Sequence, residues 1–492
     1  MNQMFNALFQ AITPLNMGWM LLGTLLGVII GALPGLSAAV GISLLIPLSY
    51  GMNTVTALIV CGGIYVGAVY GGSITAILLG VPGDPASGAT VIDGYALTEQ
   101  GKSLNALGAS TTSSALGGVA GAICLMFFTP LIVKIVIKFG APEQFMMAMF
   151  GLAIIAAAAK GALVKGIIAG LFGLLIGTIG YDPITGYGRF TFGLMILDDG
   201  LELVSVIIGM FGFSQVLTLA EEARTISKTG KLEGKITDGV KSVFKSFTVI
   251  PSTLIGLLVG ALPGTGGATA NFLAYTFAAR TSKDGDTFGK GNIKGVIAPE
   301  ASNNATVGTS LIPTLAFGIP GSAPAAIVLG LLTLHGVPTG TRLFVEMSGS
   351  IYTFFWGLLF ANICLLLCLP LLKQFANVCK APHQLLIPTV LILCILGSYS
   401  LNNSMFDVAV SVVMGILAYF MKKAGFPAVC LLLGLVLGEM TEQNLFRSLL
   451  MYDNSMSFIF TRPVCLVIFF LIVIAIGLPI VKDLMSRKKA VN

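Results

Sequence analysis

Long apolar runs separated by short polar stretches follow one another along the whole chain. A membrane-spanning helix needs about 20 mostly apolar residues, and many runs in this chain reach that length. The apolar segments lie near 17–48, 54–82, 109–138, 144–161, 162–181 and 203–220, and then near 247–279, 301–334, 349–375, 384–402, 406–421, 427–442 and 457–482. The pattern predicts an all-α polytopic integral membrane protein with about 10–14 membrane segments.

Composition excludes a soluble globular protein. Of the 492 residues, 55% are hydrophobic and only 10% are charged, whereas soluble proteins carry about 25% charged residues. The net charge of +6 is explained by basic loops on one membrane face, so we expect the lipid bilayer as a partner and no nucleic acid.

Two parts of the chain match each other in sequence. "GVIIGALPGLSAAVGISLLIPL" at 27–48 matches "GLLVGALPGTGGATANFLAYTF" at 256–277, and "ILLGVPGDPAS" at 77–87 matches "LAFGIPGSAPA" at 315–325. Because the matches occur in the same order, they predict a duplication. We expect a first transmembrane repeat at 1–220, a basic cytoplasmic linker at 221–246 and a second transmembrane repeat at 247–492.

The distribution of charge indicates that the two repeats are inverted. The first charged side chain of the chain is Asp84, so the loops around 17–48 carry no charge. Basic residues flank 247–279 on both sides: Arg224, Lys228, Lys231, Lys235, Lys241 and Lys245 before it, and Arg280, Lys283, Lys290 and Lys294 after it. Loops rich in Lys and Arg stay in the cytoplasm. Both ends of 247–279 are therefore expected inside, as an inverted-topology repeat would place them.

The segment 247–279 is too long for one straight membrane helix. A helix of its length would rise about 50 Å, against a hydrocarbon core of about 30 Å. Pro263 removes a backbone donor and Gly264 permits unusual backbone conformations, so the helix is expected to break there. Either a re-entrant hairpin or a kinked helix stabilised by its neighbours satisfies the pattern.

The broken elements supply the candidate substrate-binding residues. Exposed backbone N–H groups at a half-helix N-terminus attract a carboxylate, and small polar side chains add donors. The candidates are Pro34, Gly35, Ser37, Gly72, Ser73, Pro82, Gly83, Pro263, Gly264, Thr265, Asn271, Asn303, Asn304, Pro320, Gly321 and Ser322. The alternative for each is that small residues simply allow helices to pack closely.

Coupling to a cation or proton is assigned to Asp84, Glu300, Thr269 and Thr309. Ionisable groups at membrane depth are costly and usually functional, although Asp84 and Glu300 can also lie in loops at the membrane interface. Freed carbonyls and hydroxyl oxygens suit Na⁺, which is the only metal expected. We expect no other cofactor.

No motif for enzymatic chemistry is complete, and we expect no catalytic residues. In "GYALTEQGKS" (94–103), Ala96 stands where a phosphate-binding loop requires its first Gly. "GLSAA" (35–39) is not a nucleophile elbow.

Three long stretches resemble a known family. "YVGAVYGGSITAILLGVPGDPASGATVIDGY", "APEASNNATVGTSLIPTLAFGIPGSAPAAIVLGLLTLHG" and "GALPG" with "SAAVGISLLIPLSYG" are similar to the large membrane subunit of the tripartite tricarboxylate transporters, of the TctA type. The resemblance extends over essentially the whole chain.

The resemblance implies a permease of the bacterial inner membrane, with a small membrane subunit of the TctB type and a periplasmic solute-binding protein of the TctC type as partners. It implies uptake of citrate or other tricarboxylates, of dicarboxylates or of aromatic acids, driven by a Na⁺ or H⁺ gradient with alternating access at a midplane site. A channel-type solute or ion pore is the alternative, because re-entrant segments also build selectivity filters.

Overall fold

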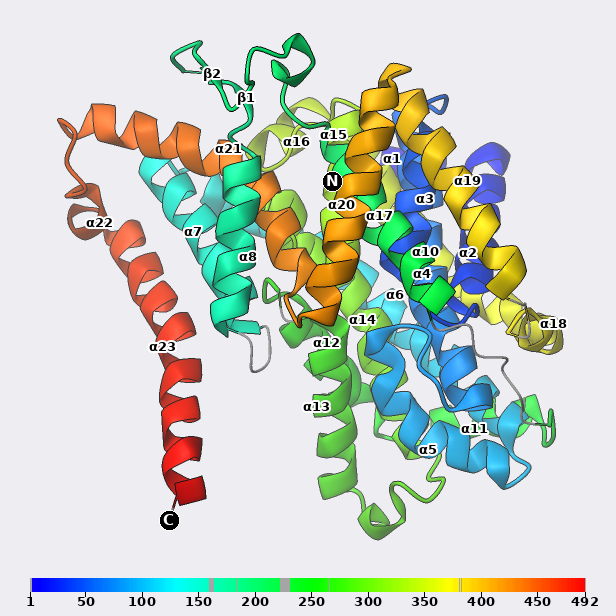
Figure 1. Cartoon of the computed structure of the whole chain (residues 1–492). Coiled ribbons are helices and arrows are strands. Elements are labelled where there is room, and N and C mark those ends of the chain that lie inside the picture. Colours follow the sequence, from blue (N-terminus) through cyan, green and yellow to red (C-terminus); the bar gives the residue numbers. More distant parts are fainter. Residues whose placement is uncertain are drawn as a thin grey trace.

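The computed structural model describes residues 2–158, 163–182, 184–221, 231–264, 266–379, 381 and 383–491 (Figure 1). The helices and strands up to residue 221 are α1 (Asn2–Ala11), α2 (Pro14–Gly31), α3 (Ala38–Ser49), α4 (Thr54–Leu79), the 3-10 helix η1 (Pro85–Ser87), α5 (Gly88–Glu99), α6 (Ser103–Val136), α7 (Ala141–Ala158), α8 (Leu163–Ile176), β1 (Gly180–Tyr181), β2 (Gly188–Arg189), the 3-10 helix η2 (Met195–Leu197), α9 (Leu203–Ile207), the π-helix η3 (Ile208–Phe213) and α10 (Ser214–Glu221).

The elements of the remaining chain are α11 (Ile236–Lys245), α12 (Val249–Gly260), α13 (Gly266–Thr281), the 3-10 helix η4 (Gly285–Thr287), α14 (Lys294–Phe317), α15 (Ala323–Leu334), α16 (Thr341–Glu346), α17 (Ser348–Cys364), the 3-10 helix η5 (Leu365–Leu371), α18 (Leu372–Val378), α19 (His383–Asn402), α20 (Met405–Lys423), α21 (Ala428–Met451), α22 (Phe458–Thr461) and α23 (Pro463–Val491).

Membrane-length apolar helices dominate the described part of the chain. By length and composition, 8 helices are able to cross a membrane, and four shorter apolar helices of 10–17 residues accompany them. The antiparallel pair β1–β2 is the only sheet among the described residues. The prediction of an all-α polytopic membrane protein is confirmed, while the division into two repeats and a linker stays a prediction.

Helices α2 and α4 pack parallel to each other at very short range. Glycines recur at every fourth position on both contact faces, at Gly23, Gly27 and Gly31 of α2 and at Gly63, Gly67 and Gly71 of α4. A Cβ atom built on Gly31 would lie 2.2 Å from the carbonyl oxygen of Ala68. Small residues at this spacing let the backbones of two membrane helices touch.

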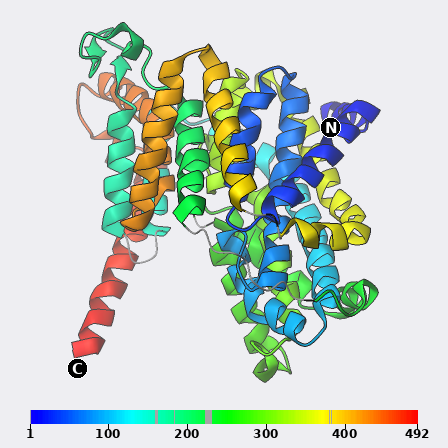
Figure 2. The ribbon, with the colours of Figure 1, turned by 45° about the vertical axis from the view of Figure 1, so that its right-hand side comes forward.

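Helices α2 and α3 form a helical hairpin, which we call the first hairpin. The start of α2 and the end of α3 lie on the same side of the molecule. After the tip at 32–37, Gly41 of α3 lies beside Ile64 of α4, and a short turn joins the end of α3 to the start of α4. Helix α3 therefore runs antiparallel to α4 and to α2. Both helices of this hairpin lie in the upper part of the molecule (Figures 1 and 2).

The helix pair α12–α13, the second hairpin, enters from the other side. Gly256 and Gly260 of α12 lie beside Ser302 and Thr306 of α14, so α12 and α14 are parallel, whereas Gly267 of α13 returns along the same helix. Figure 1 shows α12 and α13 in the lower part of the molecule. The turn between α11 and α12 bends the chain by 80°.

Two fold-back loops connect the long central helices to shorter ones. Helices α4 and α14 are antiparallel, because Tyr65 contacts Ser310 while Ser73 contacts Glu300. The loop 80–84 returns along α4, with the N–H of Gly83 donating to the carbonyl of Gly72 (3.2 Å), before η1 and α5 continue. The loop 318–322 returns along α14 in the same way before α15. Both hairpin tips and both loops therefore meet in the interior.

Candidate functional site

The hairpin tips and fold-back loops border one partly open cavity of about 420 Å³. The first hairpin contributes Ser37, the second contributes Gly266 and Gly267, and the loops contribute Asp84 and Ser322. The long helices α4 and α14 complete the wall with side chains that include Tyr65, Asn303, Thr306 and Ser310. Segments far apart in sequence therefore form one chamber.

Four helical segments begin at this cavity: α3, the continuous η1–α5 segment, α13 and α15. The first N–H groups of a helix have no partner within the helix, and each N-terminus carries roughly half a positive charge. The convergence therefore creates a positive potential in a region that carries few charged side chains. An anion is the ligand that this arrangement favours.

The local sequence explains how each segment starts. Gly35 and Gly264 adopt φ of +84° and +75°, a left-handed conformation that glycine tolerates without strain. Each follows a proline that cannot continue a helix. Ser37 caps α3 and Ser322 caps α15, each accepting a backbone N–H of its own first turn at 3.5 and 3.3 Å.

Asp84 joins the first hairpin to the first fold-back loop. One carboxylate oxygen, Oδ1, accepts the N–H of Ala86 (2.9 Å), and the other, Oδ2, accepts the N–H of Ala38 at the start of α3 (3.4 Å). The carboxylate thus occupies the N-termini of two helical segments. Among the described residues that line the cavity, Asp84 is the only acidic one.

A cluster of hydroxyl groups forms another part of the wall. The hydroxyl of Tyr65 lies 2.9 Å from Oγ of Ser322 and 3.1 Å from Oγ of Ser310. These three groups come from α4, the cap of α15 and α14, so they tie the long helices to the second fold-back loop. Each hydroxyl can both donate and accept, which suits a polar ligand.

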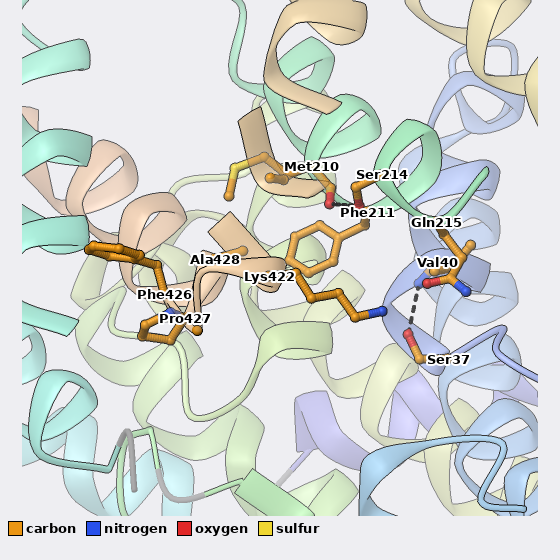
Figure 3. A pocket seen from close by; sticks show the side chains of 12 residues that line it. Ser37, Val40, Met210, Phe211, Ser214, Gln215, Lys422, Phe426, Pro427 and Ala428 are labelled. Atoms are coloured by element: carbon orange, nitrogen blue, oxygen red, sulfur yellow. Dashed lines mark hydrogen bonds between the residues drawn. The ribbon is translucent and has the colours of Figure 1, made fainter. Parts of the chain in front are cut away.

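Lys422 of α20 connects this cavity to a neighbouring one. The second cavity has a volume of about 440 Å³ and shares Ser37, Phe211 and Lys422 with the first. Figure 3 shows the Lys422 ammonium group directed toward Ser37 and Gln215. Its only polar contact among the described residues is Oγ1 of Thr218, at 3.5 Å. Phe211 belongs to the π-helix η3, a distortion that is frequent at functional sites.

Two buried carboxamides beside the cavity have unpartnered oxygens. Asn271 donates Nδ2 to the carbonyl of Ala86 (2.7 Å), but its Oδ1 has no hydrogen-bond partner. Asn303 is 1% exposed, and its Oδ1 is likewise unpartnered. Leaving a buried polar atom without a hydrogen-bond partner costs about 1–3 kcal/mol of stability. A ligand that donates a hydrogen bond to such an oxygen therefore gains binding free energy.

Glu300 forms a separate polar cluster behind the cavity. Its Oε1 accepts from the hydroxyls of Ser73 (2.6 Å) and Thr90 (2.5 Å). Its Oε2 accepts from Ser110 (3.1 Å) and Ser114 (2.9 Å). From the sequence, Glu300 could also have lain in a loop at the membrane interface. In the structure it lies inside α14 and is fully buried. Four helices, α4, α5, α6 and α14, meet at this carboxylate.

The structure brings part of the predicted substrate set to the cavity wall. Ser37, Asn303, Gly321 and Ser322 line it, together with Asp84 from the predicted coupling set. Asn271, Gly264 and Gly72 contact lining residues. Within three residues of the lining in sequence lie Pro34, Gly35, Gly83, Pro263 and Pro320. The N–H of Gly264 donates to the carbonyl of Gly321 (3.0 Å), which links the second tip to the second loop.

The remaining predicted residues lie elsewhere. Ser73 binds Glu300, Asn304 lies 3.4 Å from Oδ1 of Asn362, and Thr309 packs against Gly260. Pro82 is exposed and Thr269 is half-buried on α13. Thr265 lies outside the described residues.

Sequence reasoning did not select Lys422, Tyr65, Phe211, Thr306 or Ser310. Lys422 stands in "YFMKKAG", which reads as the charged end of a span, and nothing in that pattern indicates a cavity. Thr306 and Ser310 were detectable in principle, because they follow Asn303 at helical spacing on one face of α14.

Helices of membrane-crossing length around a polar cavity define a multi-pass membrane protein. The model of the tripartite tricarboxylate transporter TctA family matches residues 17–433. The chain belongs to this family, so it is a transporter subunit of a system that works with partner proteins.

Two relatives from Agrobacterium vitis are similar to the chain. An uncharacterized 52.8 kDa protein in the TAR-I ttuC' 3' region is 35% identical over 92% of this chain and 91% of its own length. An uncharacterized protein in the TAR-II ttuC' 3' region is 33% identical over 48% of this chain and 98% of its own length.

Proposed function

We propose that the chain is the permease subunit of a secondary transporter that imports an organic carboxylate. The observation that carries the proposal is that four helical segments begin at one cavity, two of them at the Asp84 carboxylate. The substrate class is a tricarboxylate such as citrate, a dicarboxylate or an aromatic acid.

The chemistry of the cavity favours a carboxylate over a neutral or cationic solute. Backbone N–H groups at helix starts supply fixed donors, and each helix end favours a nearby anion by about 0.3–1 kcal/mol at exposed sites and more when buried. Lys422 adds a positive charge at the junction of the two cavities. Hydroxyls of Tyr65, Ser310 and Ser322 supply adjustable hydrogen bonds.

Alternating access fits the way in which the two hairpins enter. The first hairpin lies in the upper part of Figure 1 and the second in the lower part, and residues of both line the cavity. A movement of either tip would open the substrate to one side only. The basic residues before α12 and after α13 support a cytoplasmic location for the lower side, because loops rich in Lys and Arg stay in the cytoplasm.

A Na⁺ or H⁺ gradient is proposed as the driving force. Asp84 is the acidic residue among the described residues that line the cavity. The unpartnered Oδ1 of Asn271 is an uncharged oxygen atom near it that can coordinate a cation. Both oxygens of Glu300 are already filled by four hydroxyl donors. That geometry supports a role for Glu300 in holding helices together, and leaves Thr269 and Thr309 as more distant candidates for coupling.

Partners and location complete the proposal. The substrate is delivered by a periplasmic solute-binding protein, and a small membrane subunit accompanies this chain in the bacterial inner membrane.

Uptake into proteoliposomes tests the function. The chain, its small membrane subunit and its binding protein are reconstituted, and uptake of labelled citrate, succinate and benzoate is followed under an imposed Na⁺ or pH gradient. Accumulation of one acid above its external concentration, dependent on a gradient and on the binding protein, is expected. Equilibration without accumulation would instead establish a channel, and an absence of uptake for all acids would contradict the proposal.

A further inference from the structure

Helix α11 directs aromatic and basic side chains away from the rest of the molecule. Phe244 is 71% exposed, and Phe247, in the turn that follows the helix, is 77% exposed. Lys241 is exposed and lies three residues before Phe244 and four before the exposed Lys245, so these three side chains share one side of the helix. We call Lys241, Phe244, Lys245 and Phe247 the α11 face. Packing within the described chain leaves its two large apolar rings uncovered.

The opposite side of α11 is fixed to the start of α6. A Cβ atom built on Gly239 would lie 2.0 Å from the carbonyl oxygen of Asn105, so the two backbones touch. Val243 is buried, and the N–H of Lys235 donates to Oδ1 of Asn105 (2.9 Å). These contacts determine the rotation of the helix about its axis. They therefore keep the α11 face directed outward.

Helix α12 places the α11 face at the boundary of the membrane. Ile250, Leu254 and Leu258 of α12 are exposed and follow Phe247 at helical spacing. Exposed apolar side chains along a membrane helix face lipid, because lipid is the surrounding solvent there. The 80° bend between α11 and α12 lays α11 across the direction of α12, in the lower part of Figure 1. The α11 face therefore continues the lipid-facing stripe at the level where the hydrocarbon ends.

The charge of this segment complements an anionic membrane surface. Between residues 231 and 245, four basic side chains outnumber two acidic ones: Lys231, Lys235, Lys241 and Lys245 against Glu233 and Asp238. None of these four lysines forms an ion pair with another described residue. Lysines near a membrane surface are attracted by the phosphates of anionic lipids. Lysines beside aromatic rings are typical of helices that lie in the membrane interface.

We propose that the α11 face binds anionic phospholipids. The rings of Phe244 and Phe247 lie between the headgroup ends of the acyl chains, and the ammonium groups of Lys241 and Lys245 contact the headgroup phosphates. This site goes beyond the proposed transport function, because it concerns the surrounding lipid and does not depend on the transported solute. It attaches the start of the second hairpin to the membrane surface.

A tryptophan reporter, Phe244→Trp, tests the site in the full chain. The variant is reconstituted into vesicles of equal parts phosphatidylcholine and phosphatidylglycerol. One of the two lipids is brominated near the headgroup end of its acyl chains, so that it quenches tryptophan fluorescence on contact. The fluorescence of the chain without the reporter, which contains Trp19 and Trp356, is subtracted. Brominated phosphatidylglycerol is expected to quench the reporter roughly twice as strongly as brominated phosphatidylcholine, because the lysines enrich the anionic lipid around it.

Two double variants of the reporter chain test the role of the lysines. In K241Q/K245Q the two brominated lipids are expected to quench equally. The matched control is K283Q/K290Q, which removes two exposed charges from the loop between α13 and α14. This control is expected to keep the preference for phosphatidylglycerol.

Each contrary result overturns the site. Equal quenching by the two lipids with all lysines present would exclude selection of the anionic lipid. A preference that survives in K241Q/K245Q, or that is lost equally in both double variants, would show that Lys241 and Lys245 do not form the site. An absence of quenching by either lipid would exclude contact between residue 244 and the membrane. None of these results measures solute uptake, so the proposed function would stand in every case.

Discussion

The buried carboxylate of Glu300 provides the sharpest test of how the central helices are held together. The perturbation is Glu300→Gln, which keeps the size of the side chain and removes its charge. Each carboxylate oxygen now accepts two hydroxyl hydrogen bonds, at 2.5–2.6 Å on Oε1 and at 2.9–3.1 Å on Oε2. Glutamine replaces one of these oxygens by an NH₂ group, so two hydroxyls face a donor instead of an acceptor.

The expected loss follows from these contacts. Hydrogen bonds to a charged group contribute about 1.5–3 kcal/mol each, so losing two costs about 3–6 kcal/mol. The displaced hydroxyls can rotate and accept from the amide, which recovers about 1 kcal/mol each. The amide is also less costly to bury than a carboxylate. We therefore expect a net decrease of about 1–3 kcal/mol in the free energy of unfolding.

Thermal unfolding in detergent, followed with a thiol-reactive dye, measures this loss. The dye reports unfolding because seven of the eight cysteines are buried. Glu346→Gln is the matched control: its partner Arg342 lies 3.7 Å away in an exposed pair, and such pairs contribute little. We expect a Tm several degrees lower for E300Q and unchanged for E346Q. An E300Q Tm equal to that of wild type would refute the inference that this carboxylate joins the four helices.

Three further predictions concern the site and its scaffold. Lys422→Gln should raise the KM for carboxylate uptake at least tenfold. The control is Lys423→Gln, which should leave the KM unchanged, because the Lys423 ammonium group pairs with Glu221 at 2.7 Å. Equal KM values for both variants would contradict a role for Lys422 in substrate binding. Asn271→Ala removes the 2.7 Å bond to the Ala86 carbonyl and should lower uptake at least tenfold with normal membrane expression, and wild-type uptake would show that this link is dispensable. Gly27→Ala places a Cβ atom 2.5 Å from the carbonyl oxygen of Ile64 and should lower the free energy of unfolding by about 1–3 kcal/mol. The control Gly18→Ala, whose Cβ atom meets nothing within 4 Å, should raise it by up to about 1 kcal/mol. A Tm for G27A no lower than that for G18A would argue against close α2–α4 contact.

Apolar run length and the shortage of charge determined the protein class without tertiary information. The length of 247–279 and the Pro263–Gly264 pair predicted a break, because local backbone chemistry alone prevents a continuous helix there. The matching sequences around Gly35 and Gly264 also singled out the elements whose tips border the cavity. These inferences depend on properties of adjacent residues, which a sequence records directly.

The tertiary structure was needed to decide between a hairpin and a kink. It was also needed to decide which polar residues face the cavity and which do not. From the sequence, Ser73 and Asn303 were predicted to bind substrate and Glu300 to couple a cation or proton. The rotation of α4 and α14 directs Ser73 and Glu300 toward each other, away from the cavity, and directs Asn303 toward it. Lys422 reaches the chamber only because α20 ends beside the first hairpin, although more than 300 residues separate it from Ser37. Composition and spacing therefore determined which helices form and where they break. Helix packing decided which of their side chains share one space, because contacts between distant segments depend on the facing of each helix and leave no local pattern in the chain.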